Sequence, residues 1–174
     1  RLLDGYAPFL APDFERAHFD FRLAALRGVK EPEPRWRRGV NLLDGAVGEL
    51  LGRLYVEREF PPEARERILQ LVQNLVAAFD ASIGELEWMT PPTRAEARRK
   101  LARFAVKIGY PGRWRDYDRL EILPGDLVGN VRRAREFEFE RQIAKLGRPI
   151  DRDEWLITPQ TVNAYYNPLM NEIV

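Results

Sequence analysis

The sequence predicts a mainly α-helical protein, a helical bundle-like segment that ends in a short β-hairpin. Three observations lead to this fold class. Apolar residues recur at helical spacing through most of the 174 residues. Prolines and glycines divide these periodic stretches into segments of helix length. The stretch 161–174, in contrast, is β-branched and aromatic on both sides of a turn-like centre.

Two helices are predicted in the first third of the chain. Residues 13–27 carry apolar side chains at helical spacing, and Gly28 closes this helix. A proline-containing loop follows at 30–34. Residues 36–54 then form a helix with one apolar face. This helix contains Gly45, Gly48 and Gly52, although glycine costs helix stability relative to alanine. Either another segment approaches the helix closely at these glycines or the helix is irregular there.

Two further helices are expected in the middle of the chain. Pro61-Pro62 begins the first, whose apolar stripe runs from Ile68 to Ile83. Thr90 caps the second, whose inner face we expect to continue to Ile108 before a glycine- and proline-rich stop. Basic residues populate the positions 94–107. They could bind phosphate or an acidic peptide, but a solvated helix face is the preferred interpretation.

The last helix and the tail complete the prediction. Residues 111–124 form a loop, Asp126 caps a helix that continues to Ile143, and Gly147 is its C-cap. Residues 161–166 and 171–174 are two strands joined by a turn. Because the chain stops inside the second strand, we expect it to be an internal fragment of a longer protein.

The composition excludes several function classes. Hydrophobic residues make up 45% and charged residues 32%, which is ordinary for a globular protein with a core. The net charge of +1 offers no argument for nucleic acid as a partner, and no apolar run is long enough for a transmembrane segment. There is no cysteine, His18 is the single histidine and Ser82 the single serine. A zinc site of the usual kind and a Ser-His-Asp triad are therefore not expected, so we predict no catalytic and no metal-binding residue in this chain.

Asn163, Ala164 and Tyr165 are the candidate substrate-binding residues. A peptide can be held by adding itself as a strand to a free sheet edge. The Asn163 side chain can both donate and accept a hydrogen bond, the small Ala164 leaves room for a neighbouring backbone, and Tyr165 can wall a side-chain pocket. By itself, this pattern is compatible with any hairpin.

A family resemblance makes the interpretation specific. The segments 162–168 and 171–174 resemble the substrate-binding strand of the neprilysin and endothelin-converting-enzyme family of zinc metallopeptidases. Several other segments resemble family landmarks in the expected order: Arg35-Trp36, Gly48–Val56, Leu86–Thr90, Lys107–Pro111 and Asp151–Trp155. The residues of these segments are most similar to those of bacterial members, and the absence of cysteine agrees with a bacterial member.

The resemblance implies a zinc-dependent endopeptidase that hydrolyses small peptides. In such an enzyme the Asn163 side chain and the Ala164 backbone would hold the substrate, and Tyr165 would border a pocket on the non-primed side. The zinc ligands would lie in the remainder of the same polypeptide, so this segment alone is expected to be inactive. Residues 1–60 would end a helical capping lobe and connect the lobes, and 61–174 would begin a thermolysin-like catalytic lobe. Family members usually act outside the cytoplasm.

The alternative is a non-enzymatic helical protein-interaction module. Its surface would be either the strand edge at Ile173-Val174 or the basic positions 94–107. The coding sequence after Val174 separates the two hypotheses. An H-E-x-x-H motif there indicates the peptidase, whereas a stop codon indicates the interaction module.

Overall fold

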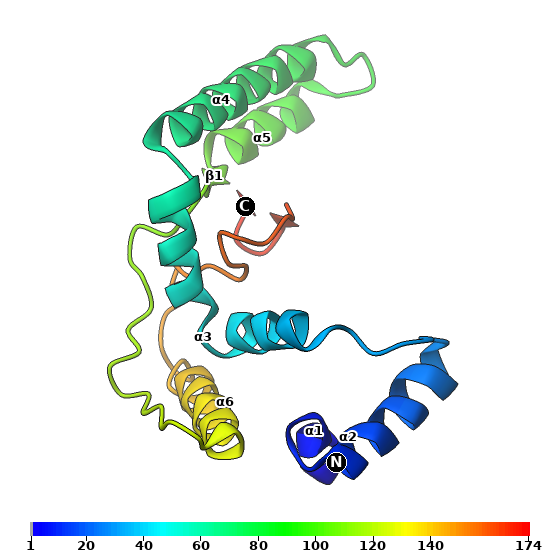
Figure 1. Cartoon of the computed structure of the whole chain (residues 1–174). Helices are drawn as coiled ribbons and strands as arrows, with labels where there is room; N and C mark the ends of the chain where they lie inside the picture. Colours follow the sequence, from blue (N-terminus) through cyan, green and yellow to red (C-terminus); the bar gives the residue numbers. More distant parts are fainter. Residues whose placement is uncertain (1) are drawn as a thin grey trace. The chain divides into compact units, whose positions relative to one another are not determined.

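The computed structural model describes residues 2–174 and is mainly helical, as predicted (Figure 1). The chain divides into two compact units, each of which has its own contacts. Unit 1 comprises Arg1–Gly48 and Asp116–Ile150, and unit 2 comprises Glu49–Arg115 and Asp151–Val174.

Unit 1 is built from short N-terminal helices and two longer ones. Its elements in chain order are α1 (Leu2–Tyr6), the 3-10 helix η1 (Ala7–Phe9), α2 (Pro12–His18), the π-helix η2 (Phe19–Ala25), the first part of α3 (Arg35–Glu59) and α6 (Leu127–Ile143). The predicted helix 13–27 is thus α-helical and then π-helical, and Gly28 ends it with φ +69°. Ala7, Val131 and Ala134 are buried in this unit.

Helix α6 begins after its cap at Asp126 and ends at Ile143 as its sequence predicts, but its C-cap is Ala144 and not Gly147. The Asp126 side chain accepts a hydrogen bond from the Gly129 N–H at 3.0 Å, which satisfies one of the free donors at the helix start. Gly147 adopts φ +71° in the turns that follow the helix, so the chain changes direction there and not at the helix cap. On the preceding loop, Tyr117 is buried and stacks on Phe137 of α6, with ring centroids 5.4 Å apart.

The glycines of helix α3 have two explanations, an irregular helix and the close approach of another segment, and each holds at a different place. The backbone is non-helical at Val47, with φ −136° and ψ 35°, so the helix is kinked there. Further along, Gly52 is buried because a loop passes close to it. A Cβ atom on Gly52 would lie 2.7 Å from Cδ of Pro159. The glycine therefore permits a contact that any larger residue would block.

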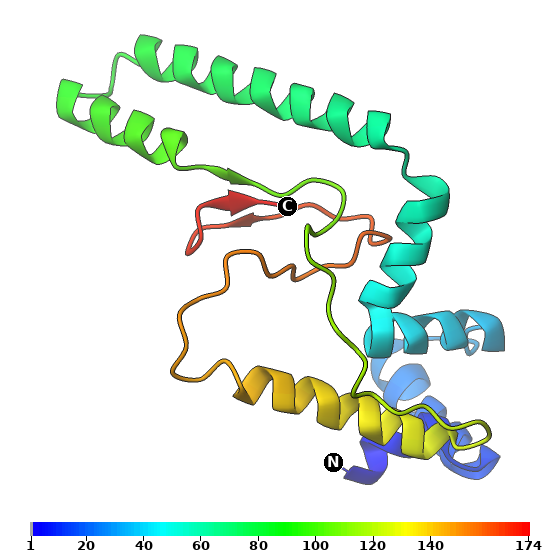
Figure 2. The ribbon, with the colours of Figure 1, turned by 90° about the vertical axis from the view of Figure 1, so that its left-hand side faces the viewer.

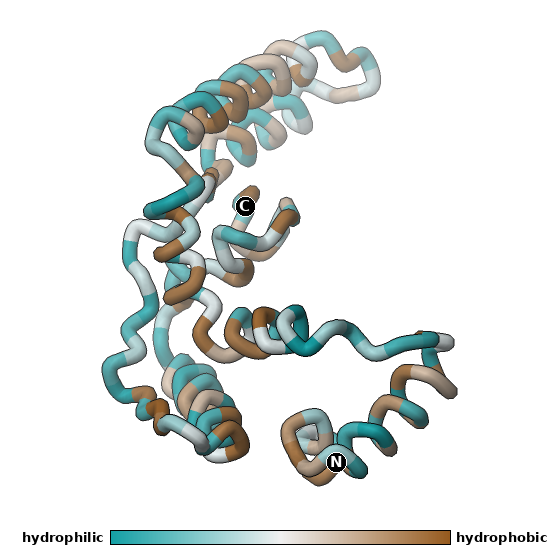
Figure 3. Tube along the Cα trace, in the orientation of Figure 1, coloured by the Kyte–Doolittle hydropathy of each residue, from teal (hydrophilic) through white to brown (hydrophobic). Residues whose placement is uncertain are grey.

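Unit 2 contains a pair of adjacent helices, α4 (Pro62–Glu85) and α5 (Pro91–Ala102), which lie side by side in Figures 1 and 2. Thr90 caps α5 by accepting a hydrogen bond from the Thr93 N–H, as predicted. The apolar stripe of α4 is visible as brown bands in Figure 3. It is only partly covered, since Val72 is buried whereas Leu71 and Phe79 are exposed.

The end of α5 differs from the prediction. The helix stops at Ala102 instead of continuing to Ile108, and Ala105–Val106 form the strand β1. The Ala105 N–H donates to the Asn171 carbonyl and the Lys107 N–H to the Ile173 carbonyl, both at 2.9 Å. Pairing with a strand far along the chain thus outweighs the local helical pattern.

The sheet has three short strands in the order β1-β3-β2. The hairpin is confirmed, since β2 (Tyr166–Asn167) pairs antiparallel with β3 (Glu172–Ile173), but its first strand is shorter than the predicted 161–166 because the Asn163 N–H bonds locally to the Thr161 carbonyl. β1 pairs parallel with β3 on its other side, and Figure 2 shows green β1 beside the red hairpin. Consequently β3 is central and β2 is an edge strand.

Candidate functional site

The candidate segment Asn163–Tyr165 lies directly before β2, and hydrogen bonds to the end of β3 fix its last residue, Tyr165. The Tyr165 N–H donates to the Val174 carbonyl at 3.1 Å, and the Val174 N–H donates to the Tyr165 carbonyl at 3.0 Å. The two residues therefore form a hydrogen-bonded antiparallel pair that continues the register of β2 and β3.

This register points the backbone groups of Ala164 away from the hairpin. In an antiparallel ladder, both polar groups of a residue next to a hydrogen-bonded pair face the opposite edge. Ala164 and Tyr166 stand in that position on either side of Tyr165. Because β2 is an edge strand, the Ala164 carbonyl lies on the open side of the sheet. Ala164 itself is exposed, and its side chain is a single methyl group.

The Asn163 carboxamide is oriented by its own neighbour. Its Oδ1 accepts a hydrogen bond from the Ala164 N–H at 2.8 Å. The acceptor of the amide is therefore occupied, while Nδ2 stays available as a donor on an exposed residue. Asn163 Nδ2 and the Ala164 carbonyl together form a donor and acceptor pair, which is what the backbone of an extended peptide requires.

The Tyr165 side chain points to the face of the hairpin opposite that of Ala164. Side chains alternate along a strand, so Tyr165 shares the inner face of the hairpin with Glu172 and Val174, both of which are buried. Burial raises the pKa of Tyr165, and the negative charge of Glu172 raises it further, whereas the backbone of Leu156 acts in the opposite direction. The structure thus leaves Asn163 and Ala164 exposed and turns the half-buried Tyr165 inward.

Lys107 and Glu172 form a buried charged pair at the hairpin, although the landmark segments that contain them do not indicate this contact. The Glu172 side chain is almost completely buried, and Lys107 Nζ lies 2.8 Å from its Oε2. The sequence predicts Lys107 on the solvated face of a helix; this prediction is wrong, because Lys107 follows β1 and its side chain is mostly buried. The two residues are far apart in the sequence, so no local pattern could have indicated their contact.

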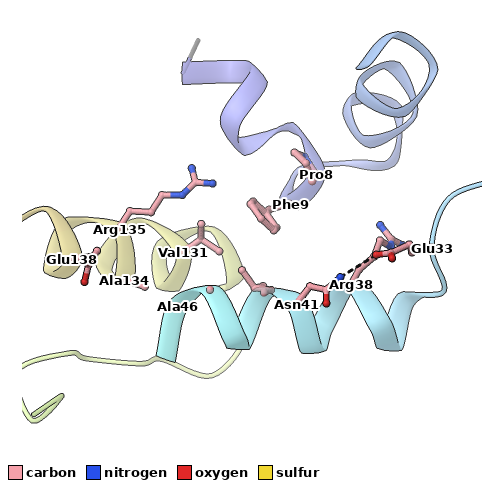
Figure 4. Close-up of a pocket in the computed structure, with 12 residues that line it drawn as sticks. Pro8, Phe9, Glu33, Arg38, Asn41, Ala46, Val131, Ala134, Arg135 and Glu138 are labelled. Atoms are coloured by element: carbon pink, nitrogen blue, oxygen red, sulfur yellow. Dashed lines mark hydrogen bonds between the residues drawn. The ribbon is translucent and has the colours of Figure 1, made fainter. Parts of the chain in front are cut away.

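Unit 1 contains a separate cavity of about 580 Å³, shown in Figure 4. Phe9, Leu42, Val131 and Ala134 form much of its apolar lining. Some of the polar side chains that line this cavity are hydrogen-bonded to one another or to the backbone. Asn41 Nδ2 donates to Glu33 Oε2 at 3.0 Å, for example. None of the candidate residues 163–165 lines this cavity.

The described residues do not fit a metal centre. Within residues 2–174, no three histidine, cysteine, aspartate or glutamate side chains converge in a way that could hold a metal ion. His18 Nε2 lies 3.9 Å from Asp4 Oδ1 and is thus near a single carboxylate. No helix among the same residues combines the length and the hydropathy that crossing a membrane requires.

Comparison with known proteins agrees with the sequence landmarks. The model of peptidase family M13 matches residues 1–111, which is more than half of the chain. The neutral endopeptidase of Lactobacillus helveticus is 29% identical over 99% of the chain and 27% of its own length. Neprilysin of Oryctolagus cuniculus is 29% identical over 95% of the chain and 24% of its own length. The chain therefore belongs to peptidase family M13.

Solved structures support the same assignment. The crystal structure of the Mycobacterium tuberculosis zinc metalloprotease ZMP1 in complex with an inhibitor matches with a TM-score of 0.91 and 49% identity. The match covers 99% of the chain and 26% of that protein. The chain spans about a quarter of the length of the relatives it matches. The resemblance inferred from the landmark segments is thereby confirmed.

Proposed function

We propose that this chain is part of a zinc-dependent endopeptidase that hydrolyses small peptides, and that Asn163 and Ala164 align the substrate. One observation carries the proposal: in a member of a peptidase family, the hairpin presents Asn163 Nδ2 and the Ala164 carbonyl at an exposed sheet edge. The backbone of an extended peptide would donate its N–H to the Ala164 carbonyl. Its carbonyl would accept from Asn163 Nδ2, so that the substrate becomes an added strand.

Tyr165 has a different part in the proposal. Its ring would border the non-primed pocket from the inner face of the hairpin, where Glu172 and Val174 are buried beside it. Zinc would supply the activated water in the intact protein, and its ligands would come from the remainder of the polypeptide. Residues 1–60 would belong to a capping lobe and its connection, and 61–174 to the catalytic lobe. We place the intact enzyme outside the cytoplasm.

The proposal is tested on the intact protein by zinc analysis and peptide cleavage. We expect stoichiometric zinc and endopeptidase activity. Asn163→Ala should lower kcat/KM by about 5- to 150-fold, which corresponds to roughly 1–3 kcal/mol for a polar partner left unpaired in the complex. An intact protein that binds no zinc and cuts no peptide would refute the enzymatic function.

Asn163→Asp serves as the matched variant. The aspartate retains an oxygen for the Ala164 N–H and so preserves the local backbone, but it has no Nδ2 donor. It should therefore lose activity by a factor similar to that of Asn163→Ala. If Asn163→Asp kept the efficiency of the wild type while Asn163→Ala lost it, the intramolecular bond to Ala164, and not the donor, would be what matters.

A further inference from the structure

Glu172 is the most deeply buried charged side chain described in this protein, with 2% of its surface exposed. A carboxylate in such a place is unstable unless a cation and further hydrogen bonds compensate for the lost water. Lys107 provides the cation. Its Nζ lies 2.8 Å from Glu172 Oε2, and its side chain is only 11% exposed.

Lys107 also binds a second part of the chain. Its Nζ donates a hydrogen bond to the carbonyl of Glu154 at 2.8 Å. Glu154 precedes the candidate segment Asn163–Tyr165 in the sequence, and Glu172 follows it. One ammonium group therefore holds the chain on both sides of the segment proposed to align a peptide.

The backbone of Lys107 contributes to the same arrangement. Its N–H donates to the Ile173 carbonyl at 2.9 Å and so fixes the parallel register of β1 on β3. β3 in turn sets the position of the edge strand, because Val174 exchanges two hydrogen bonds with Tyr165. The connection thus runs from Lys107 through β3 to the free edge at Ala164.

The register needs such a support because the strands are very short. β2 and β3 contain two residues each, so few ladder bonds oppose a slip. A slip by one residue would exchange the two faces of the hairpin and turn the Ala164 backbone groups toward β3. If β3 is the strand that shifts, the slip also moves the Glu172 carboxylate away from Lys107, and the separation of a buried pair is strongly unfavourable. The pair therefore holds β3 in place, and the hydrogen bond from Lys107 to the Glu154 carbonyl holds the chain that leads to the edge strand.

We infer that Lys107, acting through Glu172 and the Glu154 carbonyl, is a positioning residue for the substrate-aligning segment Asn163–Ala164. The inference rests on the proposed peptidase function. It predicts that loss of the pair weakens peptide binding at the strand edge more than it changes the chemical step.

The test uses the intact protein and separates KM from kcat for a peptide substrate. Lys107→Met removes the ammonium and keeps an apolar chain of similar length. We expect KM to rise at least 5-fold with zinc content retained and kcat changed less than 3-fold. The matched control is Asp80→Asn, which breaks the exposed ion pair with Arg98 between α4 and α5 in the same unit. KM of this control should stay within 2-fold of the wild type.

A double variant separates positioning from stability. Replacing both partners of a buried pair by apolar residues often restores folding stability. Lys107→Met combined with Glu172→Met should therefore recover thermal stability, but KM should stay raised because the ammonium that binds the Glu154 carbonyl is still missing. If stability and KM both return to wild-type values, the pair is structural only and the inference is wrong. KM within 2-fold of the wild type in Lys107→Met also overturns it.

Two milder variants apply if Lys107→Met does not fold. Glu172→Gln keeps the shape and an acceptor oxygen, and Lys107→Arg keeps the charge with a different donor geometry. Both should fold and raise KM at least 2-fold, and an unchanged KM in both refutes the inference. A wild-type protein without zinc or peptidase activity would instead refute the proposed function, so the two failures are distinguishable.

Discussion

Gly52 of α3 lies so close to Pro159, in the loop before the hairpin, that no side chain fits at position 52. A Cβ on Gly52 would lie 2.7 Å from Pro159 Cδ and 2.9 Å from Gln160 Oε1. The proline ring is rigid, so relief would require movement of the loop backbone. This contact connects a helix to the segment that leads directly into Asn163.

Gly52→Ala should therefore destabilise the protein. Overpacking costs about 1–3 kcal/mol, and the better helix propensity of alanine offsets it by at most about 1 kcal/mol. The measurement is the midpoint of urea unfolding. Gly39→Ala on the same helix is the control, because nothing lies within 4 Å of a Cβ at that position. The control should be neutral or more stable than the wild type, and equal effects of the two changes would contradict the contact.

Gly109→Ala should be destabilising for two reasons. Gly109 has φ +82°, which is unfavourable for a residue with a Cβ, and that Cβ would lie 2.7 Å from Cε1 of Phe60. Phe60 packs edge-on against Tyr110 at 6.0 Å between centroids, so it has little freedom to move. We expect a loss of roughly 2 kcal/mol or more in urea unfolding, as for strain combined with overpacking.

The neighbouring Gly112 is the control for Gly109. No atom lies within 4 Å of a Cβ built there, and its φ is not positive in the left-handed range. Gly112→Ala should leave the unfolding midpoint nearly unchanged. A large loss in Gly112→Ala would show that the whole loop is intolerant of side chains, independently of Phe60.

Asp126 should make the stability of unit 1 sensitive to acid. The hydrogen bond from Arg133, followed by that from the Gly129 N–H, lowers the pKa of Asp126 below 3.8. A carboxylate with a lowered pKa stabilises the fold above the ordinary value, and this contribution is lost as the pH falls below about 4. Asp126→Asn keeps an acceptor for Gly129 but loses the charge. Its thermal midpoint should be below that of the wild type at pH 7, and the gap should close toward pH 3; a constant gap would contradict the prediction.

Tyr165 should act at the alkaline end of the pH range. Burial, followed by the charge of Glu172, raises its pKa above 10.0 in the folded protein. The unfolded chain therefore ionises first, and the contribution to stability is complete below pH 10 and is lost as the pH rises through the raised pKa. Thermal midpoints measured from pH 8 to 11 should fall less steeply in Tyr165→Phe than in the wild type. If the thermal midpoints of the two proteins fell equally with pH, the Tyr165 phenol would be exposed to water, and the prediction would be wrong.

Much of the helical structure was predictable because its determinants are local. The prolines at the start of α4, the cap at Thr90 and the cap at Asp126 act on backbone groups within one turn of themselves. The hairpin was predictable for a similar reason, since its turn and alternating residues lie within one short stretch. The family landmarks were also recognisable from the sequence, because each is a short continuous segment.

The segment after Ala102 was decided by tertiary structure. Its apolar spacing continues the helical pattern, yet β3 offers backbone hydrogen bonds to Ala105 and Lys107 that a helix end cannot match. The same pairing turns Lys107 from an expected surface position toward Glu172. A buried charge pair depends on two residues meeting in space, and sequence spacing carries no information about that meeting.

The sequence by itself thus determined the helices, the turn and the family, because propensity, capping and motif order are properties of neighbouring residues. Only the tertiary structure decided which side of the hairpin is open. The exposed Ala164 carbonyl and the inward Tyr165 both follow from the pairing with β3. That register depends on long-range hydrogen bonds and on the buried pair of Lys107 and Glu172. These interactions form only when residues that are far apart in the sequence come together in the folded protein.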